Sequence, residues 1–249
     1  MFTTDEIVEV PGTKTKLRAA PVALIPEVAS YRGLRQSVGI VAFALPFALA
    51  LPVAVGRHWI LAEPKYAPLM QHWIEDSISA YYHTFTRNFF VGSLCAIALL
   101  MGYNKGYDRR DAIAGRLSAI CALGVAFFPV KPDQNATPLQ DHISDIHYAF
   151  AGVLFAILAY FCLVLFRMTA VGQRVTRKKL QRNLVYAICG WIIVGSIVSL
   201  ALLKVLDYCK ACHLDSMRKD LHLTFWLESV ALLAFGFAWL VKGETILRD

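Results

Sequence analysis

Long apolar runs separated by short polar segments dominate this chain. Six runs approach the roughly 20 residues that a helix needs to cross a bilayer, and they lie near residues 37–56, 84–104, 112–130, 145–166, 184–206 and 221–241. Amphipathic turns at 76 and 142 predict that the second and fourth helices begin earlier. Pro46 and Pro52 lie inside the first run, which membrane helices tolerate. The pattern predicts an all-α, polytopic transmembrane helix bundle of six spans.

Composition supports a membrane protein over a soluble one. Hydrophobic residues make up 57% of the 249 positions and charged residues only 17%, against about a quarter in soluble domains. This balance argues against a soluble enzyme, a secreted disulfide scaffold and a disordered tail. We expect a cytoplasmic N-terminal segment over residues 1–36 and one six-helix transmembrane domain over residues 37–249.

The basic residues predict the orientation. With six spans, 16 of the 25 Lys and Arg residues fall on one side and 7 on the other. Cytoplasmic loops carry the excess of basic residues, so both termini are expected in the cytoplasm of a bacterial inner (plasma) membrane. This rule explains the formal charge of +7 without a nucleic-acid partner. The bilayer itself is the expected partner.

All seven histidines fall on the opposite, periplasmic side under this topology. Ser79, His83 and Arg87 are spaced i, i+4, i+8, which on one helix places them on one face. The full set of histidines is His58, His72, His83, His142, His147, His213 and His222.

Ionisable residues at membrane depth usually face a bundle interior or a wet cavity. We therefore expect three helix ends to converge on an outward-facing pocket, and imidazole with carboxylate suits zinc or another transition metal. The candidate ligands are His83, His142, His147 and His222, with Asp145 or Glu228 as ligand or general base. The alternative is structural: plain hydrogen-bonding histidines and an Arg87–Glu228 ion pair that locks two helices.

A second motif lies in the last outer loop. Cys209-Lys-Ala-Cys212-His213 has the C-x-x-C-H pattern of covalent c-type haem attachment. The histidine would supply an axial ligand to the iron. The alternatives are a short-range disulfide between the two cysteines, or free thiols.

Several stretches resemble a group of uncharacterised bacterial six-span membrane proteins. They are Ser77-Ile-Ser-Ala-Tyr-Tyr-His-Thr84, Phe90-Val-Gly92, Gly106-Tyr-Asp108, His147-Tyr-Ala-Phe150, Phe225-Trp-Leu-Glu228, Ala234-Phe-Gly236 and Trp239-Leu-Val-Lys-Gly-Glu244. This likeness implies no activity.

A weaker likeness is to the membrane hydrolase superfamily of alkaline ceramidases and progestin/adipoQ receptors. Ser79-Ala-Tyr-Tyr-His83 is similar to the Ser-x-x-x-His of their second span. The chain departs from that pattern elsewhere, with no Asp within the third predicted span and only His222 in the last. The likeness implies a zinc amidohydrolase that acts on lipid.

Three hypotheses follow from the sequence. The first is a metal-dependent hydrolase of a lipid or lipid-linked substrate, with metal-bound water as nucleophile, Ser79 as a supporting donor, and Asp145 or Glu228 moving protons. The second is an electron-transfer protein that carries haem on Cys209 and Cys212. The third is a non-enzymatic accessory or transport protein whose buried polar residues hold helices together.

Overall fold

The computed structural model describes residues 26–60, 74–104, 108–132, 136–169, 176–208 and 220–246. Within these ranges every regular element is a helix, which confirms the all-α prediction. Each of the six long helices overlaps one of the predicted apolar runs. They are α1 (Pro26–Ile60), α2 (Arg87–Gly102), α3 (Arg109–Phe127), α4 (Pro138–Leu163), α5 (Arg177–Tyr208) and α7 (Leu223–Lys242).

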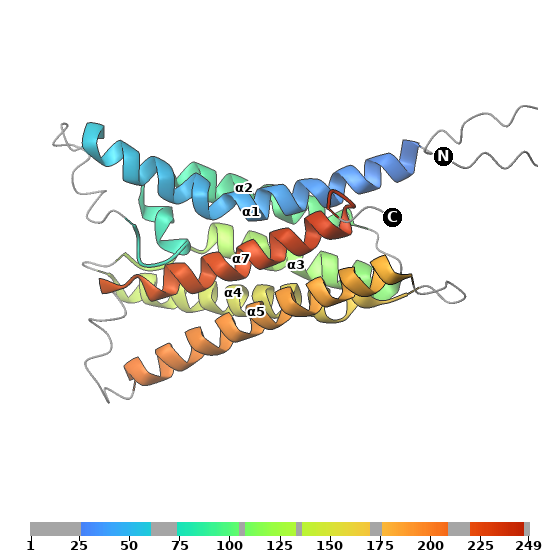
Figure 1. Cartoon of the computed structure of the whole chain (residues 1–249). Helices are drawn as coiled ribbons and strands as arrows, with labels where there is room; N and C mark the ends of the chain where they lie inside the picture. Colours follow the sequence, from blue (N-terminus) through green and yellow to red (C-terminus); the bar gives the residue numbers. More distant parts are fainter. Residues whose placement is uncertain are drawn as a thin grey trace, which may run out of the picture.

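The six helices form a closed ring in chain order. Each one packs on its two neighbours in the sequence α1, α2, α3, α4, α5 and α7, and α7 returns to α1. Successive helices run in opposite directions, so α1 begins and α7 ends at the same end of the bundle (Figure 1). We call this the basic end, and the opposite end, where α4 and α7 begin, the histidine end. Up-and-down topology is the usual result when short connections join long helices.

Among the described residues, four helices are long and apolar enough to cross a membrane: Tyr31–Gly56, Pro138–Arg167, Arg177–Leu206 and Leu223–Lys242. Helix α2 is apolar but has only 16 residues. Helix α3 carries Arg109, Arg110, Asp111 and Arg116 and is not among the four. The structure thus supports a membrane protein with four candidate spans, and the crossing of all six helices stays a prediction.

The core includes a cluster of aromatic rings. Trp239 of α7 packs against Phe161 of α4, Phe166 and Phe235, with ring centroids 5.2 to 5.9 Å apart. Phe166 lies in η3 (Leu165–Arg167) and also contacts the ring of Tyr186 in α5. These contacts join α4, α5 and α7 near the basic end. Large apolar side chains also face outward along the helices, as expected for a lipid-exposed surface; they include Leu51, Leu99, Trp191 and Leu202.

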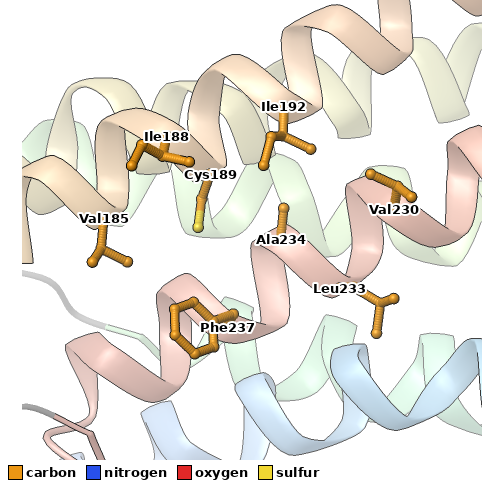
Figure 2. A pocket seen from close by; sticks show the side chains of 8 residues that line it. All are labelled: Val185, Ile188, Cys189, Ile192, Val230, Leu233, Ala234 and Phe237. Carbon is orange, nitrogen blue, oxygen red and sulfur yellow. The ribbon is translucent and has the colours of Figure 1, made fainter.

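An apolar groove of about 380 Å³ runs between α5 and α7. Val185, Cys189 and Ile192 line it from α5, and Ala234 and Phe237 from α7 (Figure 2). Every side chain that lines the groove is apolar. The groove opens to the surface of the bundle, where Ile192 on its α5 wall is 39% exposed.

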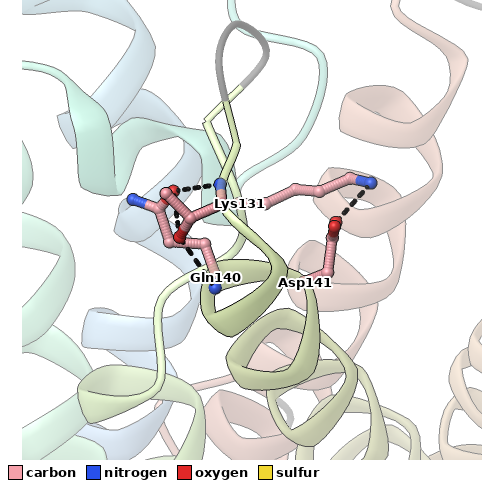
Figure 3. Close-up of polar contacts among 4 residues, drawn as sticks. Lys131, Gln140 and Asp141 are labelled. Atoms are coloured by element: carbon pink, nitrogen blue, oxygen red, sulfur yellow. Dashed lines mark hydrogen bonds and ion pairs between the residues drawn. The ribbon is translucent and has the colours of Figure 1, made fainter.

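Helix α4 has a well-defined start at the histidine end. Thr137 and Gln140 form a capping box, and Pro138 occupies the first turn, where its missing N–H costs nothing. One turn into the helix, Asp141 forms an ion pair of 2.9 Å with Lys131 (Figure 3). Helix α4 therefore begins four residues before the amphipathic turn predicted at 142.

The second predicted helix is interrupted, which corrects one expectation. Residues Ser79–His83 form a separate 3₁₀ helix, η2, and α2 begins only at Arg87. Thr84 is extended between them, with φ −104° and ψ 175°, and its hydroxyl bonds the carbonyl of Tyr81 at 2.8 Å. Ser79, His83 and Arg87 therefore do not share one face of a continuous helix.

Candidate functional site

A serine and a histidine from separate elements meet at the histidine end. The distance between Ser79 Oγ in η2 and His147 Nε2 in α4 is 2.9 Å. The other ring nitrogen, His147 Nδ1, lies 2.6 Å from the carbonyl oxygen of Phe128, at the end of α3. Both side chains are buried: His147 is 1% exposed and Ser79 8%. The pair is thus shielded from bulk water.

The carbonyl of Phe128 decides the tautomer of His147. A carbonyl oxygen only accepts, so the neutral imidazole carries its proton on Nδ1 and donates it to Phe128. The lone pair on Nε2 then accepts the hydroxyl proton of Ser79. A serine that donates to a histidine, itself oriented by a third group, is the arrangement that activates a hydroxyl as a nucleophile.

The segment before Ser79 is tied to the start of α7. The main-chain N–H of Ile78 donates to Glu228 Oε2 at 2.7 Å. The N–H of Phe225 donates to the carbonyl of Asp76 at 2.9 Å. Ser77 Oγ accepts from the N–H of Ala80, which begins the turn of η2. These bonds fix the position of Ser79 through groups on either side of it.

Tyr81 packs η2 against the start of α7. Its side chain is fully buried, and its ring lies 6.0 Å from that of Phe225. Its hydroxyl oxygen accepts the N–H of Glu75 at 3.4 Å. Burial raises the pKa of Tyr81 to about 12, because the phenolate loses hydration there. Tyr81 therefore stays neutral and serves as a packing anchor for the segment that carries Ser79.

The other histidines have different partners. His83 Nε2 lies 2.7 Å from the carbonyl oxygen of Val130, just beyond α3. His222 Nδ1 lies 3.1 Å from Asp76 Oδ1, and His222 has a left-handed backbone with φ 46° at the start of α7. His83 and His147 together satisfy two carbonyls after the end of α3, a place where helices leave acceptors without internal partners.

The residues of the predicted metal centre make separate contacts in the described structure, and the metal site stays a prediction. Within the described ranges, no three His, Cys, Asp or Glu side chains are placed to hold one ion. His142 and Asp145 are exposed on the surface of α4. In this structure the Nε2 lone pair of His147 faces the Ser79 hydroxyl, and Nδ1 faces the Phe128 carbonyl. Of the four histidines expected at one end of the bundle, His83, His147 and His222 turn to separate partners.

Arg87 and Glu228 also differ from the expected ion pair. Glu228 accepts the Ile78 N–H, whereas Arg87 donates to the Tyr82 hydroxyl and stacks over that ring at 4.2 Å. The two charged side chains form no ion pair with one another in the described structure. Glu228 thus holds the backbone beside Ser79, and Arg87 bonds a different group, the Tyr82 hydroxyl.

The haem motif falls outside the described residues. Cys209, Cys212 and His213 belong to residues 209–219, between α5 and α7, which are not described. His72 lies in another range that is not described, residues 61–73. The side chain of His58 is likewise not described. Haem attachment, a disulfide and free thiols at this motif all stay predictions.

Sequence patterns do not reveal the hydrogen-bond partners that surround Ser79 and His147. The carbonyls of Phe128 and Val130 are main-chain acceptors, and any residue type supplies one. Asp76 was also missed; the sequence signal was its position just before the Ser77-Ile-Ser79 turn. Comparison with known proteins adds no assignment: no protein-family model, curated protein or solved structure matches this chain.

Proposed function

We propose that this chain is a membrane-embedded hydrolase of lipid esters or amides, with Ser79 as nucleophile and His147 as general base. The observation that carries the proposal is the Ser79–His147 hydrogen bond of 2.9 Å, with His147 oriented by the Phe128 carbonyl. The proposal places the reaction on a serine rather than on metal-bound water, because Ser79 Oγ and His147 Nε2 are already in hydrogen-bond contact.

The proton follows a closed route in this mechanism. As Ser79 Oγ bonds the substrate carbonyl carbon, its proton passes to His147 Nε2. His147 then gives that proton to the leaving oxygen or nitrogen, and the acyl group stays on Ser79. A water molecule next attacks the acyl carbon and gives a proton to Nε2. Departure of Ser79 takes the proton back and releases the carboxylic acid.

Glu228 has a positioning role in this proposal. Its carboxylate accepts the main-chain N–H of the residue before Ser79, whereas His147 bonds the Ser79 hydroxyl. Asp145 is exposed and takes no part. The expected proton carrier is therefore His147, while Glu228 holds η2 in position beside α4.

A membrane setting favours a lipid substrate, and the distribution of basic residues favours one orientation of the bundle in the membrane. Few basic residues of the described ranges fall at the histidine end: Arg57, Arg87, Lys131 and Lys204. Those at the basic end are Arg32, Arg35, Arg109, Arg110, Arg167, Arg177, Lys178, Lys179, Arg182 and Lys242. We propose that the basic end faces the cytoplasm. Ser79 then serves the outer leaflet of a bacterial inner membrane, with six spans and both termini cytoplasmic.

Hydrolysis by the purified full chain tests the proposal. A panel of fluorogenic lipid esters and N-acyl amides is supplied in detergent micelles, with and without a metal chelator. Ser79→Ala is expected to abolish turnover, and His147→Gln to lower it about a hundredfold or more. Ser118→Ala is the matched control, because its buried hydroxyl bonds only the Ala114 carbonyl within α3.

Three results would contradict the proposal. Turnover that the chelator abolishes would return the reaction to a metal-bound water. Turnover that Ser79→Ala leaves intact would remove the serine from the chemistry. A folded protein that hydrolyses no member of the panel would favour the accessory or transport hypothesis, in which the same hydrogen bonds only hold helices together.

A further inference from the structure

One buried hydroxyl beside the candidate site has no hydrogen-bond partner. Ser144 of α4 is 1% exposed, and its Oγ bonds no other group in the part of the chain that the structure describes. The buried Ser118 of α3 shows the usual arrangement, because its Oγ donates at 2.8 Å to the carbonyl of Ala114, four residues earlier. Buried polar groups are almost always hydrogen-bonded, so the exception at Ser144 calls for a partner such as a bound water.

Ser144 lies on the same face of α4 as His147. The two residues are three positions apart, which places them one above the other on a helix. Both are buried, whereas Asp145, Ile146 and Tyr148 are exposed, so the shared face is turned into the bundle. Side chains on a helix lean toward its N-terminus, so the imidazole of His147 lies over the turn that carries Ser144.

Ser144 also lies between His147 and the aqueous end of α4. It is about 4.5 Å nearer than His147 to the start of the helix, at 1.5 Å per residue. About one turn before Ser144, Asp141 forms its ion pair with Lys131, and these two side chains are 49% and 53% exposed (Figure 3). The inward face of α4 therefore leads from this charged, solvated turn past Ser144 to His147.

We propose that Ser144 holds the water molecule that hydrolyses the acyl-enzyme on Ser79. This inference rests on the proposed hydrolase function. After acylation, Ser79 Oγ has no proton to donate, so the lone pair on His147 Nε2 is open to a water. One O–H of this water donates to Nε2 and the other donates to Ser144 Oγ, which holds the water between two groups one helical turn apart.

The hydrolytic step follows the proton balance of the proposed mechanism. The water oxygen bonds the acyl carbon while one proton passes to His147 Nε2. The bond from the acyl carbon to Ser79 Oγ then breaks, and Oγ takes this proton as the carboxylic acid leaves. Ser144 makes and breaks no covalent bond and is a positioning residue. Its role is confined to deacylation, because Nε2 bonds the Ser79 hydroxyl before acylation.

A para-nitrophenyl ester of a medium-chain fatty acid separates the two steps in the detergent-purified full chain. Release of nitrophenol in the first turnover measures acylation. Intact-protein mass spectrometry follows the decay of acyl-Ser79 once the ester is removed. Ser144→Ala is expected to slow deacylation about tenfold, the effect of one hydrogen bond, and to change acylation less than about twofold. Its Tm should be unchanged or raised, because the lost hydroxyl has no partner in the described structure.

Two further variants complete the experiment. Ser118→Ala is the matched control, because it also removes a buried hydroxyl from a helix, and it is expected to leave both rates unchanged. Ser144→Cys keeps nearly the volume of the serine but has only a weakly hydrogen-bonding thiol, so the same selective loss of deacylation is expected. This second variant tests the role of the hydroxyl even where Ser144→Ala disturbs the fold.

Equal deacylation in the wild type and the Ser144 variants would overturn the proposal. Equal slowing of both steps would also overturn it, and would assign Ser144 to the stabilisation of the oxyanion or to packing. Both results leave the proposed hydrolase function standing. A wild-type chain that forms no acyl-Ser79 would remove that function, and the role of Ser144 with it.

Discussion

The carboxylate of Glu228 accepts the main-chain N–H of Ile78 at 2.7 Å, and so joins α7 to the residue directly before Ser79. Ile78 is the cap of η2, so this bond sets where the short helix begins. The N–H of Phe225 in α7 also donates to the carbonyl of Asp76, so the segment that carries Ser79 is held by α7, while its base, His147, lies on α4. The relative position of two helices therefore determines whether Ser79 and His147 meet.

Removal of this bond is expected to separate the pair. Glu228→Ala leaves the Ile78 N–H without its acceptor, at a cost of about 1–3 kcal/mol in stability. We expect the rate of Ser79 acylation to fall at least about tenfold, with a smaller change in KM. Glu228→Gln keeps an amide oxygen that accepts the same N–H, and should retain most of the rate. Equal acylation rates in wild type and Glu228→Ala would show that the bond does not position Ser79.

Close approach of α1 and α7 requires glycine at the crossing. A Cβ at Gly236 would lie 2.7 Å from Phe43 N and 2.9 Å from the Gly39 carbonyl, and these main-chain atoms cannot yield easily. Gly236→Ala is expected to destabilise the protein by about 1–3 kcal/mol, measured by thermal unfolding in detergent.

Gly195→Ala in α5 is the matched control, because nothing lies within 4 Å of its added Cβ. It should leave stability unchanged or slightly raised. An equal loss in both variants would mean that the α1–α7 crossing has no special need for glycine.

Alkaline pH is expected to unfold the protein partly through Tyr81. The folded pKa of Tyr81 is about 12, above the value of about 10 in an unfolded chain. The folded state holds this proton more tightly, so the contribution is complete below pH 10 and is lost as pH rises from 10 to 12. Tyr81→Phe should flatten the fall of Tm over that window. An unchanged slope in Tyr81→Phe would assign the alkaline loss to other groups.

The orientation is tested by chemical labelling in cells. Leu139 at the start of α4 is 67% exposed at the histidine end, and Arg177 is exposed at the basic end. In a background with Cys209 and Cys212 replaced by serine, a membrane-impermeant maleimide should label Leu139→Cys in intact cells. Arg177→Cys should react only after the inner membrane is opened, because the basic end stays in the cytoplasm. The opposite labelling pattern would invert the topology.

The sequence was sufficient to predict the helices and insufficient to predict their polar contacts. Apolar runs located all six helices, because burial in lipid or in a core leaves a direct composition signal. The break between η2 and α2 was missed: Thr84 is extended, and no proline or glycine marks the place. Arg87 consequently turns toward Tyr82 instead of sharing a face with Ser79.

The pairing of Ser79 with His147 spans 68 positions of the chain. It depends on which helices are neighbours in the ring, and the hydrophobic pattern of a single helix does not contain that information. The metal hypothesis assumed that histidines at one end converge. In the described structure His83 and His147 bond separate carbonyls after α3, and main-chain acceptors have no residue signature.

The reactivity of Ser79 is the most direct test of the proposed function. The detergent-purified full chain is treated with a fluorophosphonate, which reacts with activated serines, and the adduct is located by peptide mass spectrometry. We predict one adduct, on Ser79, that is lost in His147→Gln and kept in Ser118→Ala. An unmodified Ser79, or equal modification in His147→Gln, would contradict the claim that His147 activates this serine.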